Sequence, residues 1–368
     1  MRTSTLGLAV GAAFGGVVGV ASRGQTLVPW PDSVEKAFAP ALGGLTGAVA
    51  AIKTDLLISA IRHPRRVPIA LLGAAGIVAL TAVVARSAAR TVLGQLQQKS
   101  RDLDPGFAAA PTSAFVTGSD ASGLPLAAMG REGARFVGQV TLPEDVLAVT
   151  GEPMIADPIR VFVGVESAPT ITERVHLAMT EMHRTGAFDR KYLLIQSPAG
   201  TGYANSTPVD VLEMLSRGDS ATVVIGFGLL PSFLSLPKVR DAAQTQRELL
   251  DAIVAELRDR THRPTLLMYG ESLGAQVQQG AVPGGLADLD AYGIANALWV
   301  GTPGSRTADE FHARCTLSSV TIDRAEQVPA DSGACWPRVW FLEHDGDPVV
   351  RFRSELIAER PFWLDPQA

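Results

Sequence analysis

The sequence has 368 residues, of which 46% are hydrophobic and 19% are charged, and its formal net charge at pH 7 is −5. Soluble domains carry about 25% charged residues, so this chain is unusually apolar. The negative charge and the lack of a basic stripe with interleaved aromatic residues argue against nucleic acid as a partner. The length allows one domain of about 200–250 residues and an additional segment.

Three apolar stretches in the first part of the chain predict membrane helices. They cover residues 5–22, 37–61 and 67–85, and the last has 19 residues without a charge. The first stretch has the alternative interpretation of a signal peptide. The second is interrupted by Lys53 and Asp55, so it either spans the bilayer or lies in its interface. Residues 1–92 are therefore predicted to be a transmembrane region of two or three spans.

The basic residues between the second and third stretches set the expected orientation. Arg62, Arg65 and Arg66 form a cluster that should face the cytoplasm. With three spans, everything after about residue 95 lies outside the cytoplasm. We therefore expect a multi-pass protein of the cell membrane with membrane lipids as partners.

Residues 93–115 are predicted to be an amphipathic connector, and residues 116–368 a separate folded domain. In that domain, short runs rich in β-branched residues alternate with helical patterns, which is typical of an α/β fold with a mostly parallel sheet and helices on both faces. The predicted strands are 160–166, 191–197, 221–226, 265–269, 297–301 and 339–343. The predicted helices are 172–185, 208–216, 238–259, 273–280 and 307–314.

Gly270-Glu271-Ser272-Leu273-Gly274 fits the G-x-S-x-G nucleophile elbow, with a predicted strand before it and a predicted helix after it. Such a turn is so tight that the serine backbone is strained and Gly270 and Gly274 leave no room for side chains. It would lift the Ser272 hydroxyl above the sheet edge, next to the N-terminus of a helix. The alternative is an ordinary glycine-rich turn with an N-capping serine.

The elbow predicts where the other catalytic groups should lie. The backbone N–H of Leu273 and an N–H from the loop after strand 191–197, at Gly200 or Thr201, would form an oxyanion hole; the loop could equally be a plain connection. The strand 339–343 leads to Asp347, our choice for the acid, with Asp345 second. The same residues are also strong turn formers.

The expected histidine base should follow the acid, and no histidine follows Asp347. Of the six histidines, His344 is near the expected edge of the sheet but precedes the acid. The others are His63, His176, His183, His262 and His312. Two cysteines, Cys315 and Cys335, are either a disulfide or two unrelated thiols. We expect no metal site and no cofactor.

Several segments resemble a family of actinobacterial membrane proteins that have an N-terminal multi-span region followed by an α/β-hydrolase domain. They are RVFVGVESAPTITERVHLAM, TGAFDRKYLLIQSPAGTGY, GESLGA, ALWVGTP and EHDGDPVV. The resemblance implies that Ser272 is the nucleophile and Asp347 the acid. It also implies a longer C-terminal part with a histidine, so the hydrolase domain here is expected to lack its C-terminal part.

These observations predict a membrane-anchored serine hydrolase that acts on acyl esters or thioesters, including lipids. Acyl transfer to an acceptor other than water would use the same residues. The alternative is a catalytically impaired or non-catalytic hydrolase-fold membrane protein, because no histidine follows the acid. A transporter is disfavoured, since the spans show no repeat and contain few ionisable residues.

Overall fold

The fold is taken from a computed structural model, in which two compact units divide at residue 95. The structure describes residues 83, 86–87, 89–304, 319–328, 337–344 and 346–350. The stretches 5–22 and 37–61, and 67–85 except for Val83, lie outside these residues. Among the residues that are described, no helix is both long enough and apolar enough to cross a bilayer.

Seven strands form one sheet in the order β1-β3-β2-β4-β5-β7-β6, and every pair of neighbours is parallel. The strands are β1 (Ile159–Val163), β2 (Tyr192–Ser197), β3 (Ser220–Ile225), β4 (Thr265–Glu271), β5 (Ile294–Val300), β6 (Ser319–Ile322) and β7 (Val339–Leu342). The prediction of a mostly parallel sheet is confirmed, and its six strands are found with shifted ends. β6 was not predicted. All carboxyl ends of the strands lie at one edge of the sheet, where α/β proteins bind ligands.

Helices cover both faces of this sheet, as predicted. The α-helices are α4 (Gly130–Gly138), α5 (Pro143–Thr150), α6 (Ile171–Thr185), α7 (Thr207–Leu215), α8 (Ser232–Ser235), α9 (Val239–Leu257), α10 (Leu273–Ala281) and α11 (Leu286–Ala291). The 3-10 helices are η2 (Pro105–Phe107), η3 (Leu126–Met129), η4 (Ala187–Asp189), η5 (Leu236–Lys238) and η6 (Ala325–Gln327). The predicted helix 307–314 lies outside the described residues, and α4, α5, α8 and α11 were not predicted. In the predicted connector, residues 93–101 are helical and η2 follows.

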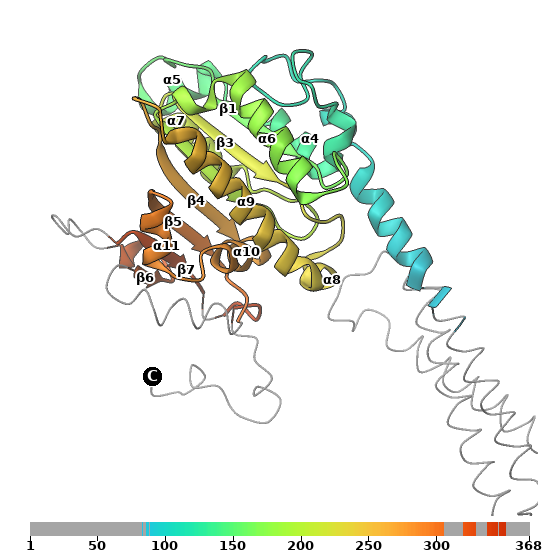
Figure 1. The fold of residues 1–368 in the computed structure, drawn as a ribbon. Coiled ribbons are helices and arrows are strands. Elements are labelled where there is room, and N and C mark those ends of the chain that lie inside the picture. The colour runs from blue at the N-terminus through green and yellow to red at the C-terminus, as the bar shows by residue number, and fades with distance from the viewer. Residues whose placement is uncertain are drawn as a thin grey trace, which may run out of the picture. The chain divides into compact units, whose positions relative to one another are not determined.

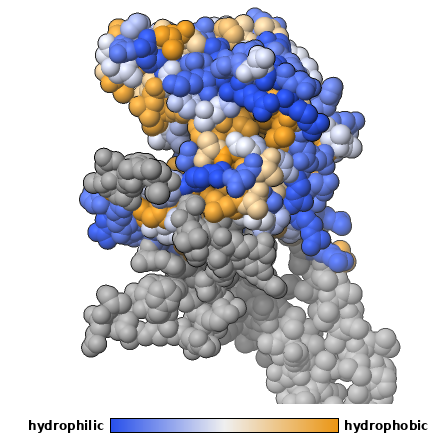
Figure 2. Space-filling view, turned by 60° about the vertical axis from the view of Figure 1, so that its left-hand side comes forward, coloured by the Kyte–Doolittle hydropathy of each residue, from blue (hydrophilic) through white to orange (hydrophobic). Residues whose placement is uncertain are grey.

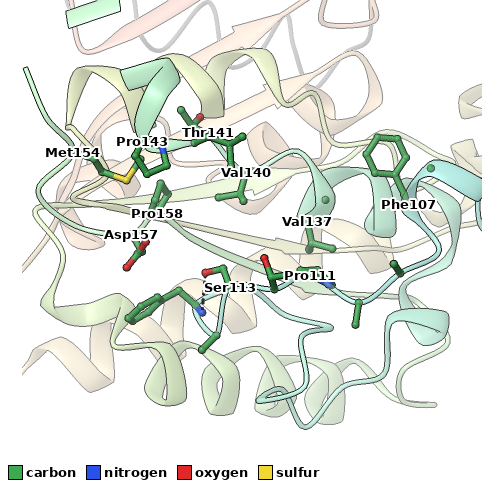
Figure 3. A pocket seen from close by; sticks show the side chains of 18 residues that line it. Phe107, Pro111, Ser113, Val137, Val140, Thr141, Pro143, Met154, Asp157 and Pro158 are labelled. Carbon is green, nitrogen blue, oxygen red and sulfur yellow. Dashed lines mark hydrogen bonds between the residues drawn. The ribbon is translucent and has the colours of Figure 1, made fainter. Parts of the chain in front are cut away.

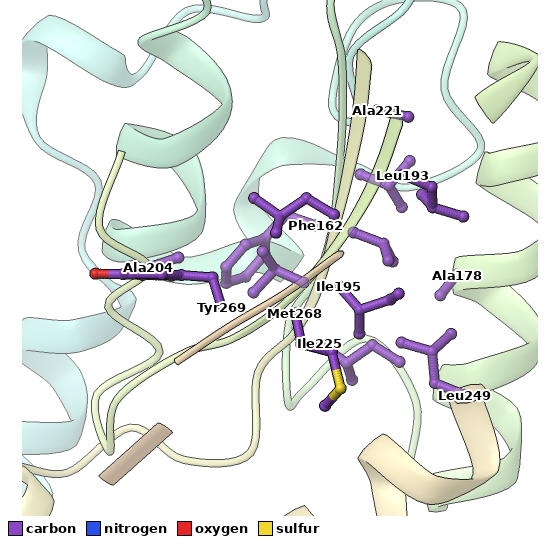
Figure 4. Close-up of a cluster of buried hydrophobic side chains, with 14 of the residues drawn as sticks. Phe162, Ala178, Leu193, Ile195, Ala204, Ala221, Ile225, Leu249, Met268 and Tyr269 are labelled. Atoms are coloured by element: carbon purple, nitrogen blue, oxygen red, sulfur yellow. The ribbon is translucent and has the colours of Figure 1, made fainter. Parts of the chain in front are cut away.

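The two layers of the core can be followed in Figure 4. Leu193, Ile195 and Met268 of the sheet point toward α6 and α9, which lie in front of the sheet in Figure 1. Phe162 and Tyr269 point to the other face, where the ring of Phe162 lies 6.0 Å from that of Phe136 in α4. Because strand side chains alternate between faces, each buried strand contributes to both layers.

A buried arginine joins the second layer to the sheet. Arg160 of β1 is fully buried, and its Nε lies 2.7 Å from Oε1 of Glu213 in α7. Its Nη1 donates to the carbonyl oxygen of Phe136 in α4 at 2.8 Å. The second Glu213 oxygen accepts the N–H of Thr141 at 3.0 Å, so one network holds α4, α7 and β1 together.

Large apolar side chains also reach the surface of the domain. Leu147 and Val149 of α5 and Val211 and Leu215 of α7 are exposed, and Figure 2 shows hydrophobic groups lying between hydrophilic ones on one face. Apolar atoms contribute more than half of the surface of most folded proteins, so these positions alone indicate no binding site.

Candidate active site

Ser272 lies between the last residue of β4 and the first residue of α10. Its backbone has φ 53° and ψ −123°, a conformation that residues other than glycine rarely adopt, and its side chain is half-buried. Such a backbone costs of order 1–3 kcal/mol and persists only where the surroundings enforce it. One such constraint is the Ser272 N–H, which donates to the carbonyl oxygen of Val300 at the end of β5, 2.8 Å away.

The two glycines of the motif are required by close backbone contacts. A Cβ at Gly270 would lie 2.8 Å from the backbone N and Cα of Ala275, in the helix that the motif opens. A Cβ at Gly274 would lie 2.3 Å from the carbonyl oxygen of Ser197, at the end of β2. Side chains at both positions would therefore collide with neighbouring backbone, in α10 for Gly270 and in β2 for Gly274, as the motif predicts.

Leu273 begins α10, and its side chain fixes the start of that helix. It is buried against Phe227, Ala242 and Val277 in a small apolar cluster. The described part of the chain provides no acceptor for the Leu273 N–H, as is usual for the first turn of a helix. This N–H and the partial positive charge of the helix N-terminus are available to a negative oxygen near Ser272.

The loop after β2 is closed by two backbone hydrogen bonds. The Ala199 N–H donates to Tyr203 O at 2.8 Å, and the Gly202 N–H donates to Ala199 O at 2.9 Å. The N–H groups of Gly200 and Thr201, which the sequence analysis predicted as oxyanion donors, take no part in these two bonds. The Gly200 N–H lies 3.4 Å from Oγ of Ser232 in α8, whereas the Thr201 N–H meets no acceptor among the described residues.

Asp347 follows β7 at the same edge of the sheet. Its Oδ1 accepts the N–H of Val349 at 2.8 Å. Its Oδ2 lies 3.5 Å from the position of a Cβ at Gly301, the residue directly after β5. β5 lies between β4 and β7, so the carboxylate is on the side of β7 that faces Ser272. Asp345, the second choice for the acid, lies outside the described residues.

No described histidine side chain contacts Ser272 or the Asp347 carboxylate. His344 accepts the Gly346 N–H at Nδ1, and its Nε2 lies 3.5 Å from Oδ1 of Asp323, after β6 on the far side of β7. His183 pairs with Glu256 at 3.2 Å. The side chains of His176 and His262 are exposed. His63 and His312 lie outside the described residues, as do both cysteines.

Glu271, directly before Ser272, forms a hydrogen-bonded polar group that the sequence analysis did not predict. Oε2 of Glu271 accepts hydrogen bonds from Asn205 Nδ2 at 2.7 Å and from the Tyr269 hydroxyl at 3.0 Å. Burial, together with the charge of Glu271, raises the pKa of Tyr269 and of Tyr203. The two-residue period of β4 places Tyr269 and Glu271 on one face, but nothing in the sequence points to Asn205 as their partner.

A cavity of about 590 Å³ lies elsewhere in the domain. Phe107, Val137, Val140 and Met154 contribute to its lining (Figure 3). Another lining residue, Pro158, directly precedes β1, so the cavity is at the amino edge of the sheet, opposite the edge that carries Ser272. Within the described ranges, no group of His, Cys, Asp and Glu side chains has an arrangement that would hold a metal ion.

Comparison with known proteins gives one family and a distant structural similarity. A family model described as an alpha/beta-hydrolase family matches residues 159–368. An iodinated complex of acetyl xylan esterase at 1.80 Å resolution has 16% sequence identity and a TM-score of 0.30, and the match covers 44% of this chain and 84% of the esterase chain. An acetylxylan esterase at 0.90 Å resolution has the same identity and coverage and a TM-score of 0.28. No curated protein matches the chain.

Proposed function

Since the chain belongs to the alpha/beta-hydrolase family, we propose that it is a membrane-anchored serine hydrolase that cleaves acyl esters or thioesters. Family membership supports a hydrolase. The proposal that Ser272 is the nucleophile depends above all on its backbone, held at φ 53° and ψ −123° between a buried strand and a helix N-terminus. Backbone strain of this kind clusters at active sites, which supports a catalytic role for Ser272.

In the proposed reaction, Ser272 Oγ attacks the acyl carbon and its proton passes to a histidine outside the described residues, because none of the described histidines contacts Ser272. The N–H groups of Leu273 and Thr201 stabilise the oxyanion, and Asp347 orients the histidine. The histidine then protonates the leaving alcohol or thiol, and water releases the acid from the acyl-serine by the same steps. Strands are about 4.8 Å apart, so the ends of β4 and β7 are separated by about 10 Å, which leaves space for a side chain over β5.

The proposed location at the membrane is based on the apolar N-terminal stretches. The basic residues around Arg65 favour a multi-pass protein whose hydrolase domain lies outside the cytoplasm. A site tethered to a bilayer would meet lipid acyl esters at high local concentration, so we include membrane lipids among its partners.

The second candidate is a non-catalytic hydrolase scaffold in the membrane. The observation that favours it is the position of His344, whose ring is directed to Asp323 and away from β4. In that case the Ser272 turn would persist without a proton acceptor.

Hydrolysis of p-nitrophenyl acetate and butyrate by the full chain in detergent separates the two candidates. We expect Ser272→Ala to remove all hydrolysis above background and Asp347→Asn to lower kcat by about 10²–10⁴-fold. Asp323→Asn is the matched control, because this carboxylate lies at the same edge but pairs with His344, and it should retain kcat. Equal rates for wild type and Ser272→Ala would contradict the proposal.

A further inference from the structure

We infer that α8 is a positioning element for the oxyanion hole, and that Ser235 sets the direction of the Thr201 N–H. This inference rests on the proposed function. The relevant contacts join α8, which follows β3, to the turn 199–202, which follows β2. They are long-range contacts between two loops at the edge of the sheet that carries Ser272.

Both polar groups of Gly200 are bound by serines of α8. The Gly200 N–H lies 3.4 Å from Ser232 Oγ, and the Gly200 carbonyl oxygen lies 3.3 Å from Ser235 Oγ. Ser235 is 1% exposed, and its single hydroxyl proton is shared between the Gly200 carbonyl oxygen and the nearer carbonyl oxygen of Leu230, at 2.9 Å. Gly200 is therefore held on both sides by a helix that contributes nothing else to the proposed mechanism.

The backbones in this contact are so close that no side chain fits between them. A Cβ at Gly200 would lie 2.7 Å from Ser232 Cα and 2.8 Å from Leu230 O. A Cβ at Gly228 would lie 2.4 Å from Gly200 O. The turn 199–202 is thus packed against 228–232 backbone to backbone, which restricts movement of the turn.

The geometry of the peptide bond carries this restraint to Thr201. The Gly200 carbonyl and the Thr201 N–H belong to the same planar trans peptide, so they point in opposite directions. When Ser235 holds the carbonyl on the α8 side, the Thr201 N–H is directed away from α8. Ser235 therefore fixes a donor that it does not touch, as is required of a preorganised oxyanion hole.

The test measures esterase kinetics together with the concentration of reactive sites, counted by fluorophosphonate titration of the full chain. Ser235→Ala should lower kcat per titrated site about tenfold with KM within twofold, a smaller effect than the 10²–10³-fold typical for loss of an oxyanion donor itself. Ser232→Ala should act in the same direction, and Ser232→Thr, which retains a hydroxyl, should restore the rate. Ser216→Ala is the matched control, because its buried hydroxyl also lies near a backbone carbonyl, 3.3 Å from Glu213 O, but at the end of α7.

The outcomes separate the two proposals. A wild-type chain that is neither active nor labelled overturns both. An active wild type with unchanged kcat per titrated site in Ser235→Ala and Ser232→Ala overturns the role of α8 and leaves the hydrolase intact. A variant that only loses titratable sites, with kcat per site unchanged, would show that the serines stabilise the fold and do not position the donor.

Discussion

The N–H of Ser272 and the carbonyl oxygen of Val300 lie 2.8 Å apart, which ties the turn after β4 to the end of the neighbouring strand. The bond continues the β4–β5 pairing one residue beyond Glu271, so the chain reaches Ser272 in a fixed position. From there it must enter α10 at once. The hydrogen bond to Val300 on one side and the immediate start of α10 on the other together hold Ser272, a non-glycine residue, at a positive φ.

The strain at Ser272 can be measured as stability. Glycine adopts φ 53° and ψ −123° without a steric penalty, although it loses more entropy on folding than alanine. We expect Ser272→Gly to have a free energy of unfolding about 1 kcal/mol higher than Ser272→Ala. Urea denaturation of the two variants, neither of which has the hydroxyl, gives the difference. A less stable glycine variant would mean that the backbone is not strained.

Crowding at Gly274 predicts a large effect of one methyl group. Because the added Cβ would approach Ser197 O to 2.3 Å and both atoms are held by backbone, we expect Gly274→Ala to destabilise the chain by about 3 kcal/mol. Gly106→Ala is the control, since no atom lies within 4 Å of its added Cβ, and it should change stability by less than about 0.5 kcal/mol. Similar thermal midpoints for the two variants would contradict the close approach.

The buried Arg160 network predicts a non-additive pair of substitutions. Arg160→Met leaves the Glu213 carboxylate buried without its cation, and we expect a loss of about 3–5 kcal/mol. Arg160→Met combined with Glu213→Leu removes the fully buried unpaired charge and leaves only the partly exposed Asp210 carboxylate without Arg160, so it should be more stable than Arg160→Met alone. Chemical denaturation of the single and double variants measures the coupling, and additive losses would show that the two side chains do not depend on each other.

Glu181 predicts part of the acid sensitivity of the domain. Burial raises the pKa of this carboxyl, but hydrogen bonds from Arg184, Ser122 and the Gly123 N–H outweigh it, and the pKa lies below its ordinary 4.5. The unfolded chain therefore binds this proton first, so the stabilisation is present above pH 4.5 and is lost as the pH falls through the folded value. Glu181→Gln should weaken the pH dependence of unfolding below pH 4.5. Parallel curves for variant and wild type would exclude this role.

The architecture was predictable because most of the strands are short, continuously buried apolar runs, as is typical of a parallel sheet covered on both faces. The alternating patterns of strands and helices predicted a parallel sheet covered on both faces, and helix 172–185 is found as Ile171–Thr185. That helix carries strong local signals, since Thr170 and Glu173 form a capping box and Gly186 ends it. β6 was missed because its four residues lie at the edge of the sheet and are mostly not buried.

The site was predictable only where local geometry determines it. The motif 270–274 was recognisable because a single tight turn explains why it needs both glycines and why its serine is exposed to strain. The contacts of Gly200 with Ser232 and of Glu271 with Asn205 join residues 32 and 66 positions apart, and no local pattern encodes them. The burial of Arg160 in a strand was equally unpredictable, because it depends on Glu213, 53 residues away.

The most direct test of Ser272 as the nucleophile is to label the full chain with a fluorophosphonate and to identify the modified residue by mass spectrometry of its peptides. We expect one phosphonylated residue, Ser272, and no labelling of the Ser272→Ala variant. Prior denaturation should abolish the reaction, because the reactivity depends on the folded turn. Labelling at another residue, or an unmodified Ser272 in folded protein, would contradict the claim that this serine is a nucleophile.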